Sequence, residues 1–398
     1  MLAALGLVTT AEEIAEAWRF VAQLRTSMAA ALPEADAILG FDDYQDISAR
    51  LGAILSGSKL PTHTPKDRRS LIPIAPAARQ PQAGEINPKL GQGGTFARKR
   101  LGNAPLAPLK IASGCDRRCT FCAIPQFRGA FISRRPTEII DEARWLAENG
   151  VSEIFLVSEN TTSYGKDFGD LRVLERLLPD LAQIDGIERI RLSYLQPAEI
   201  RPALLQAMVS TEKVVPYFDI SFQHASGPLL RRMRRFGDSE KFLLLLSQIR
   251  ALNPEAGIRS NFIVGFPGES ESEYQELVEF LSKARLDAIG IFPYSDEDKT
   301  EAATLPDKVE DEVIAARTEE LRRISEELLY ERANERIGER VRVLVEDAAT
   351  AEGRAEHQGP EVDSTTFLRS RPGQFRVGQY VDAVVSEVAG ADLVAQPL

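Results

Sequence analysis

Residues Ser113–Gly129 read SGCDRRCTFCAIPQFRG and contain all three cysteines of this 398-residue chain, Cys115, Cys119 and Cys122. The spacing is Cys-x3-Cys-x2-Cys, directly after a short apolar run that is typical of a strand. A [4Fe–4S] cubane binds one thiolate per iron, so three thiolates leave one iron open to a small molecule. We interpret the three cysteines as ligands of one such cluster, with Phe121 shielding it from water.

A structural zinc site is the main alternative for these thiols. Such a site needs a fourth ligand and usually comes as two separated pairs of ligands. The chain has three histidines, His63, His224 and His357, and none lies near the loop in sequence. The zinc interpretation is therefore disfavoured, as is a chance grouping of three inert thiols.

From Leu109 onward, short apolar runs alternate with amphipathic stretches in six strand–helix units. The six runs are LKIAS (109–113), EIFLVS (153–158), IERIRLSYL (187–195), YFDISF (217–222), IRSNFIVGF (258–266) and DAIGIFPYS (287–295). The first helix is predicted to begin at Pro136, and a long charged helix over about 307–336 closes the series. Crossover-length connections indicate a parallel α/β sheet, either doubly wound or an incomplete (β/α) barrel.

Composition divides the chain into four segments. Residues 1–58 contain a short strand followed by a helix, and residues 59–105 are a linker rich in Pro, Gly and Gln. Residues 106–336 form the α/β core. Residues 337–398 alternate in period two between turn residues, which predicts a small all-β barrel.

Composition also limits the functional classes. The formal net charge is −11, which disfavours nucleic acid and anionic membranes as partners of the molecule as a whole. No stretch approaches the length of an apolar membrane span, and the N-terminal run lacks the basic start of a signal peptide. We therefore expect a cytoplasmic protein whose clustered thiols bind metal or take part in catalysis.

The cysteine loop closely resembles the signature of the radical S-adenosylmethionine superfamily. The resemblance implies a TIM-like partial (β/α)6 barrel and S-adenosyl-L-methionine bound to the open iron, where an electron from the reduced cluster releases a 5′-deoxyadenosyl radical. It also implies cofactor-binding groups at the carboxyl ends of the strands. These candidates are Phe121, Ser158, Glu159, Asn160, Ser193, Gln223 and Gly265, with Gln196, His224, Tyr294 and Ser295 as weaker ones.

Each of these polar positions has a structural alternative, because polar residues after strands often belong to ordinary loop and cap chemistry. The resemblance assigns the ammonium group of the cofactor to the neighbourhood of Ser158, Glu159 and Asn160, and its adenine to the backbone at Gly265. No catalytic residue is assigned from the sequence.

A narrower resemblance, to the methylthiotransferases, rests on several motifs. These include GCDRRCTFCAIPQFRGAFISRRP, LVSENTTSYGKD, RLSYLQPAEI and YSDEDKTEAATLPDKV, and the C-terminal segment is similar to a TRAM domain. The family inserts sulfur into an unactivated C–H bond and methylates it. Its branches modify either transfer RNA or the β-carbon of an aspartate in a small-subunit ribosomal protein.

Charge favours the ribosomal branch. Residues 338–398 contain six basic and ten acidic residues, a balance of −4, whereas RNA-binding modules need positive charge. The expected partners are therefore a small-subunit ribosomal protein or the 30S subunit, with flavodoxin or ferredoxin as electron donor. The transfer RNA branch remains the alternative.

Two features depart from the family pattern. Methylthiotransferases hold a second iron–sulfur cluster through three N-terminal cysteines, and no cysteine precedes Cys115 here. Residues 1–58 therefore read as a truncated remnant of the N-terminal α/β domain, and the second cluster is doubtful. A catalytically impaired, ribosome-binding relic is a third hypothesis. Lys299 stands where the family favours glycine, and a lysine is acceptable there only with a negative φ.

Two groups of arginines have two readings each. Arg231, Arg232, Arg234 and Arg235 are interpreted mostly as a solvated helix face, although one of them is placed to reach the carboxylate of the cofactor or the substrate. Arg128, Arg134 and Arg135 just past the cysteine loop carry the same two readings.

Overall fold

The computed structural model describes residues 47–58, 100, 102–360, 363–371 and 373–398. The strand expected in the N-terminal segment and almost all of the expected 59–105 linker lie outside these residues. The helix expected after that strand is α2 (Ile47–Leu55).

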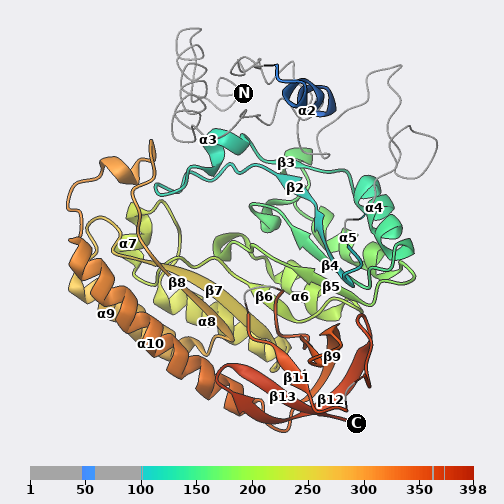
Figure 1. The fold of residues 1–398 in the computed structure, drawn as a ribbon. Coiled ribbons are helices and arrows are strands. Elements are labelled where there is room, and N and C mark those ends of the chain that lie inside the picture. The colour runs from blue at the N-terminus through green and yellow to red at the C-terminus, as the bar shows by residue number, and fades with distance from the viewer. Residues whose placement is uncertain (1–46, 59–99, 101, 361–362, 372) are drawn as a thin grey trace.

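Six parallel strands form the centre of the molecule (Figure 1). They are β1 (Leu106–Lys110), β4 (Glu153–Val157), β5 (Arg189–Leu192), β6 (Tyr217–Asp219), β7 (Gly257–Val264) and β8 (Ala288–Pro293). Two three-stranded sheets, β1-β4-β5 and β6-β7-β8, are joined by isolated parallel bridges such as Leu195 to Ile220. The order follows the chain without a reversal. The barrel alternative is therefore confirmed, and the doubly wound one is wrong.

Six helices follow these strands along the chain. They are α4 (Pro136–Glu148), α5 (Val173–Ala182), α6 (Pro202–Ser210), α8 (Ser239–Leu252), α9 (Glu271–Ala284) and α10 (Asp311–Glu335). The predicted start of the first helix at Pro136 is confirmed. The last helix begins four residues later than expected, because Asp307 has a φ of +60°, outside the helical region.

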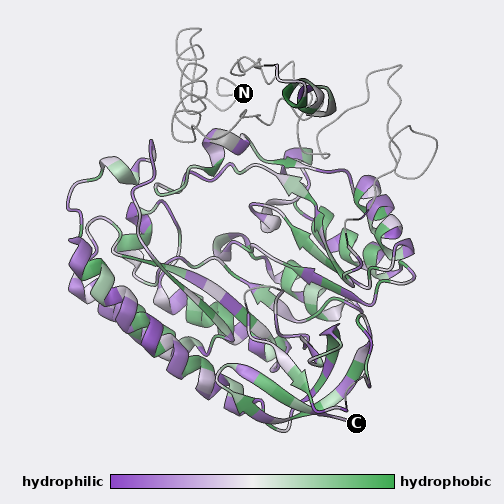
Figure 2. Ribbon diagram, viewed as in Figure 1, coloured by the Kyte–Doolittle hydropathy of each residue, from purple (hydrophilic) through white to green (hydrophobic). Residues whose placement is uncertain are grey.

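The main apolar core is made by the strands together with the helices that cover them, and Figure 2 shows hydrophobic colouring on most strands. Four phenylalanines, Phe222, Phe242, Phe262 and Phe280, contact one another with ring centroids 4.4 to 6.5 Å apart. Such pairs stabilise a core beyond the area they bury. The outward face of α10 is largely hydrophilic, as expected for a helix that covers the barrel from the solvent side.

Short elements decorate the carboxyl ends of the strands. The strands β2 (Ala112–Ser113) and β3 (Ile132–Ser133) pair antiparallel and bracket the cysteine loop, which contains α3 (Ile124–Arg128). The helix α7 (Gly227–Arg232) and the 3₁₀ turns η4 (Thr161–Ser163), η5 (Lys166–Phe168), η6 (Pro197–Glu199) and η7 (Ala302–Thr304) complete this end.

The C-terminal segment closes into a five-stranded barrel, as predicted. Its strands are β9 (Arg340–Asp347), β10 (Glu352–Arg354), β11 (Thr366–Leu368), β12 (Tyr380–Ala389) and β13 (Asp392–Pro397), in the order β10-β11-β13-β12-β9. The three-residue β10 was not predicted, because a strand this short carries no periodicity.

This C-terminal barrel docks on the amino ends of the central strands. Glu153, fully buried at the start of β4, binds Arg191 from the next strand and Arg354 from β10 at 3.0 and 3.1 Å. The Tyr217 hydroxyl at the start of β6 donates to Asp363 at 2.8 Å. The docked barrel therefore lies at the end of the central barrel opposite the cysteine loop.

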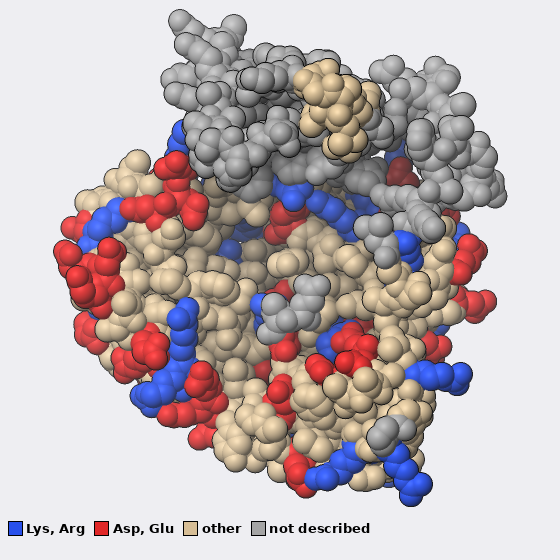
Figure 3. Space-filling view, viewed as in Figure 1, with Lys and Arg blue, Asp and Glu red and all other residues tan. Residues whose placement is uncertain are grey.

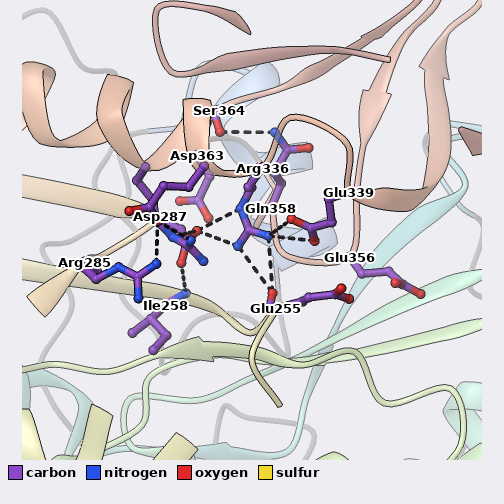
Figure 4. Close-up of polar contacts among 12 residues, drawn as sticks. Glu255, Ile258, Arg285, Asp287, Arg336, Glu339, Glu356, Gln358, Asp363 and Ser364 are labelled. Carbon is purple, nitrogen blue, oxygen red and sulfur yellow. Dashed lines mark hydrogen bonds and ion pairs between the residues drawn. The ribbon is translucent and has the colours of Figure 1, made fainter. Parts of the chain in front are cut away.

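A second set of ionic contacts anchors the end of α10 (Figure 4). Arg336 donates to Asp287 at 2.6 Å and to Glu339 at 2.7 Å, and Arg332 donates to the same Asp287 oxygen at 3.0 Å. The other Asp287 oxygen accepts from the backbone N–H of Ile258 at 2.9 Å.

In the described part of the chain, no helix is both long and apolar enough to cross a bilayer.

Candidate active site

The cysteine loop leaves the central barrel through a narrow neck. Gly114 has a φ of +83°, and a Cβ there would lie 2.1 Å from the carbonyl oxygen of Ala130. The N–H of Cys115 donates to the carbonyl of Gly129 at 3.1 Å, which closes the loop. A glycine is thus required at position 114, because the backbone of Ala130 lies too close for a Cβ. It lies beside the first cysteine in the sequence, but nothing in the one-dimensional pattern marks the close contact.

The three thiols are half-buried on this loop. Burial raises the pKa of Cys115 to about 11, against the lowering effect of the Arg117 N–H that donates to its sulfur at 3.4 Å. Burial likewise raises the pKa of Cys122. Metal binding reverses this preference, because a coordinating thiol is deprotonated.

The donor set fits an iron–sulfur cluster better than a single ion. Among the described residues, no three His, Cys, Asp or Glu side chains converge closely enough to hold one metal ion. A cubane instead takes each thiolate on a different iron and tolerates the wider separation. Phe121 is partly buried and packs against the main core, so its side chain holds the loop to the barrel.

Helix α7 and the residues after it fasten the far side of the loop. The Thr120 N–H donates to the carbonyl of Met233 at 3.2 Å, and the Thr120 hydroxyl donates to the carbonyl of Arg232 at 3.1 Å. Arg235 is 7% exposed, donates to the carbonyl of Ser221, and lies 3.7 Å from the Cys119 sulfur. The loop is therefore held by residues about 115 positions away in sequence.

The interpretation of the arginine run as a solvated helix face is confirmed for Arg231 and Arg232, which are exposed on α7, and is wrong for Arg235, which is buried. Arg234 is also exposed but lies beyond the end of the helix. Arg232 pairs with Glu273 at 2.7 Å, and Arg234 pairs with Glu301 at 2.7 Å. Arg235 is buried beside Cys119, and α7 ends at Arg232, so these side chains leave the helix in different directions. Of the two exposed arginines on α7, Arg232 is held by Glu273, and no hydrogen bond or ion pair of Arg231 is found among the described residues.

The first loop after β4 forms a hydrogen-bonded cluster. The Asn160 amide and the Ser163 hydroxyl donate to Glu199 at 2.8 and 2.7 Å, and Arg117 of the cysteine loop pairs with the same carboxylate at 2.6 Å. Burial raises the pKa of Glu199, but these donors outweigh it and the net shift is downward. Ser158 accepts from the N–H of Asn160 at 3.1 Å. Glu199 and Arg117 were not predicted, since neither follows a strand directly.

Glu159 points toward two cations instead of into this cluster. Its Oε1 lies 3.5 Å from Lys110 and 3.6 Å from Arg128. Its Oε2 is buried and has no hydrogen-bond partner among the described residues. A buried carboxylate oxygen without a donor is a costly arrangement, which a cationic ligand would relieve.

The remaining predicted positions lie on the next strand ends. The Ser193 hydroxyl donates to Asp219, which also accepts from the N–H of Tyr194 at 3.0 Å. Gln223 has a φ of +72° and joins β7 through its backbone N–H and carbonyl, at 3.0 and 2.8 Å. A Cβ on Gly265 would lie 2.4 Å from the Ile314 side chain, so contact with α10 already requires a glycine there. Asp219 was not predicted.

Two of the weaker candidates are also placed. His224 is fully buried, and burial lowers its pKa to about 3, so it is neutral. Tyr294 donates to Asp296 at 2.7 Å near the end of β8. Among the described residues, neither side chain forms a hydrogen bond with the cysteine loop.

The expectation of a negative φ at Lys299 is wrong. Its φ is +66°, in the left-handed region. Its carbonyl accepts a hydrogen bond from Gln126 of α3 at 2.8 Å, which holds this turn against the cysteine loop. The turn therefore has a conformation that favours glycine although the residue is a lysine.

A pocket of about 480 Å³ opens between the cysteine loop, the cluster around Glu199 and the residues after α7. It is lined on one side by Arg117 and Arg118, and on another by Arg231, Arg234 and Phe236. A smaller pocket that reaches Cys119 shares several of these residues. The volume lies in the range of small-molecule sites.

Comparison with known proteins gives the family. Residues 109–281 match the model of the radical SAM superfamily, and residues 337–398 match that of the TRAM domain. The chain is 58% identical over 391 residues to the ribosomal protein uS12 methylthiotransferase RimO of Streptomyces coelicolor, covering 93% of this chain and 79% of that one. It is 59% identical over 386 residues to the RimO of Kineococcus radiotolerans, with the same coverage.

A solved structure is similar at lower identity. The coproporphyrinogen III oxidase HemN from Escherichia coli, a radical SAM enzyme, matches with a TM-score of 0.45 and 16% identity, covering 57% of this chain and 54% of that one. The cofactors of the present chain are a [4Fe–4S] cluster and S-adenosyl-L-methionine. The chain belongs to the RimO methylthiotransferase family of radical SAM enzymes.

Proposed function

We propose that this enzyme adds a methylthio group to the β-carbon of an aspartate in the small-subunit ribosomal protein uS12. The observation that carries the proposal is the identity of 58% to a uS12 methylthiotransferase over 93% of the chain, which includes all three cysteines. We place the reaction in the cytoplasm, with a flavodoxin or ferredoxin as the electron donor.

The residues of the site divide into three roles under this proposal. Cys115, Cys119 and Cys122 hold the cluster, and Phe121 keeps water from it. Glu159 accepts the ammonium group of S-adenosyl-L-methionine on its buried, unpartnered Oε2. Ser158, Asn160, Ser193, Gln223 and Gly265 are assigned to the walls of the same cofactor site.

The cluster and S-adenosyl-L-methionine, when bound, supply a radical that removes a hydrogen atom from the substrate. The protein holds the reacting groups in place and excludes water. Arg235 and Thr120 fix the cysteine loop against the barrel, and the Glu199 cluster fixes Arg117 at its rim. Such preorganisation lowers the entropic part of the barrier.

The proposal is tested by anaerobic reconstitution followed by reaction with purified uS12. We expect about four iron atoms per chain for one cluster, and about eight if a second is held. We also expect 5′-deoxyadenosine release and a uS12 mass increase of one methylthio group. Replacing Cys119 by Ala should abolish 5′-deoxyadenosine release, because one cluster ligand is lost.

Ser56→Ala, on the exposed end after α2, is the control and should leave both products unchanged. Release of 5′-deoxyadenosine without a change in the mass of uS12 would contradict the proposed substrate. Zinc in place of iron in the purified protein would contradict the cofactor assignment.

A further inference from the structure

The pocket beside the cysteine loop carries an excess of positive charge. Six cationic side chains line it against two carboxylates, Asp116 and Glu199. The six are Arg117, Arg118, Lys166, Arg231, Arg234 and Arg235. An arrangement of this kind favours an anionic ligand.

Both carboxylates are already engaged. Asp116 accepts the backbone N–H of Phe131 at 3.0 Å, which ties the two ends of the cysteine loop together. Glu199 accepts from Asn160 and Ser163 and pairs with Arg117. Together the two carboxylates offset only two of the six positive charges, so the pocket keeps a net positive charge.

Three of the six cationic side chains bind a neighbouring group, and three do not. Arg117, Arg234 and Arg235 bind Glu199, Glu301 and the carbonyl of Ser221, respectively. Arg118, Lys166 and Arg231 are exposed and have no hydrogen-bond or ion-pair partner among the described residues. Arg118 lies between Cys115 and Cys119, and Arg231 lies on α7, which packs against the same loop.

The charged lining of the pocket is interrupted by one aromatic side chain, Phe236. Phe236 is 70% exposed at its rim, and Tyr194, 46% exposed, follows β5 on the same end of the barrel. An exposed aromatic ring beside a charged pocket suits a polypeptide better than a free inorganic anion, because it offers contact area to neighbouring residues of the chain.

We propose that this pocket binds the side-chain carboxylate of the aspartate that the enzyme modifies, with Arg118 and Arg231 as the specificity-determining residues. The inference rests on the proposed function. The carboxylate carbon is bonded directly to the β-carbon, so fixing the carboxylate beside the cysteine loop fixes the C–H bond that reacts. Guanidinium groups suit this task because they bind carboxylates through two parallel hydrogen bonds.

The test is a binding measurement on the full, iron-reconstituted chain. Fluorescently labelled peptides from the modified loop of uS12 carry either the aspartate or an asparagine at the target position. We expect the wild type to bind the aspartate peptide about tenfold more tightly, the equivalent of one charge-assisted hydrogen bond. The double variant Arg118→Gln/Arg231→Gln should reduce this preference to about twofold or less.

The matched control is Arg322→Gln/Arg340→Gln, which removes the same charge from two exposed side chains that have no partner among the described residues. It should keep the wild-type preference. The affinity for S-adenosyl-L-methionine, measured by equilibrium dialysis, should be unchanged in both variants. A pocket variant that loses cofactor affinity but keeps the aspartate preference would assign the pocket to the cofactor and overturn the inference.

Failure of the inference and failure of the proposed function give different results. Equal binding of both peptides by the wild type overturns the inference even if methylthiolated uS12 is formed. A wild type that prefers the aspartate peptide but forms no methylthiolated product contradicts the proposed function and supports the binding site.

Discussion

Lys299 occupies a left-handed conformation, φ +66°, that costs a residue with a Cβ about 1 kcal/mol. Replacing it by Gly should therefore stabilise the protein by up to about 1 kcal/mol, less the entropy that glycine loses on folding. Thermal unfolding followed by circular dichroism measures the change as a rise in Tm.

Lys299→Ala is the matched control for that measurement. It removes the same side chain and keeps the Cβ, so the backbone strain remains and Tm should not rise. An equal rise in both variants would mean that the lysine side chain, rather than its conformation, is unfavourable.

Glu153 gives a pH-dependent contribution to stability. Burial raises its pKa, but Arg191, Arg354 and Arg189 outweigh it and lower the pKa from 4.5 to about 2. A depressed folded-state pKa stabilises the fold above pH 4.5, and this contribution is lost as the pH falls toward 2. The full contribution is about 3 kcal/mol, taken from the size of the shift.

Glu153→Gln should therefore destabilise the protein by about 3 kcal/mol at pH 7, because it leaves buried guanidinium groups without a counter-charge. The difference between wild type and variant should shrink as the pH falls from 5 to about 3. Urea unfolding at a series of pH values measures it. A difference that stays constant with pH would show that Glu153 has the same pKa in the folded and the unfolded protein, so that the guanidinium groups do not lower it.

At the scale of single residues, the sequence predicted which side chains could bind a metal cluster better than it predicted which side chains contact one another. The three cysteines share one short loop, so their spacing was visible. Arg117, Glu199 and Asp219 were missed because their roles depend on partners 25 to 82 positions away, and no local pattern marks such pairs. Gly114 was missed for the same reason.

At the scale of elements, periodicity predicted every long strand and helix of the central barrel. The six strands and six helices each bury a regular face, which leaves a signal in the sequence. Four elements have only two to six residues each, too few to show a hydrophobic period: β2, β3, α7 and β10. Those short elements build much of the site, so its geometry needed the structure.

The start of β7 shows how closely two elements approach at the docked barrel. A Cβ on Gly257 would lie 2.2 Å from the carbonyl oxygen and 2.7 Å from the Cα of His357. Gly257→Ala should therefore loosen the C-terminal barrel, with a loss of about 2 kcal/mol, typical of overpacking. Faster tryptic cleavage within residues 337–398 measures this loosening.

Gly102→Ala is the control for Gly257→Ala, since nothing lies within 4 Å of a Cβ at that position. It should leave the cleavage rate unchanged. Identical cleavage of the Gly257 variant and the wild type would mean that the His357 loop moves aside without cost.

At the scale of the whole molecule, the two ends of the central barrel are occupied differently. The cysteine loop, the Glu199 cluster and the basic pocket lie at the carboxyl ends of the strands. The C-terminal barrel covers the amino ends through buried ion pairs, among them Glu153 with Arg354 at 3.1 Å. A barrel fixed there does not line the pocket, whose lining among the described residues comes from the central barrel and its loops.

The distribution of charge on the C-terminal barrel favours a protein over RNA as its partner. Figure 3 shows acidic and basic side chains interspersed over the visible face of the molecule. Arg354 forms ion pairs with Glu153 and Glu346, and Arg342 forms an ion pair with Glu188. Of the exposed arginines around the loop before β12, Arg369 pairs with Glu387, which leaves Arg371 and Arg376.

Arg340 at the start of β9 is a third exposed arginine without a partner among the described residues. Three free cations release few counterions from a phosphate backbone, so the salt dependence of RNA binding through this barrel should have a slope no steeper than about −3. We therefore expect that labelled transfer RNA shows no saturable binding at about 150 mM salt, where comparable weak electrostatic binders have dissociated. Fluorescence anisotropy across a salt series measures both quantities.

The variant Arg371→Gln/Arg376→Gln should behave as the wild type does toward uS12, because neither side chain reaches the pocket. Tight transfer RNA binding with a steep salt slope that this variant abolishes would instead make RNA the ligand of the C-terminal barrel.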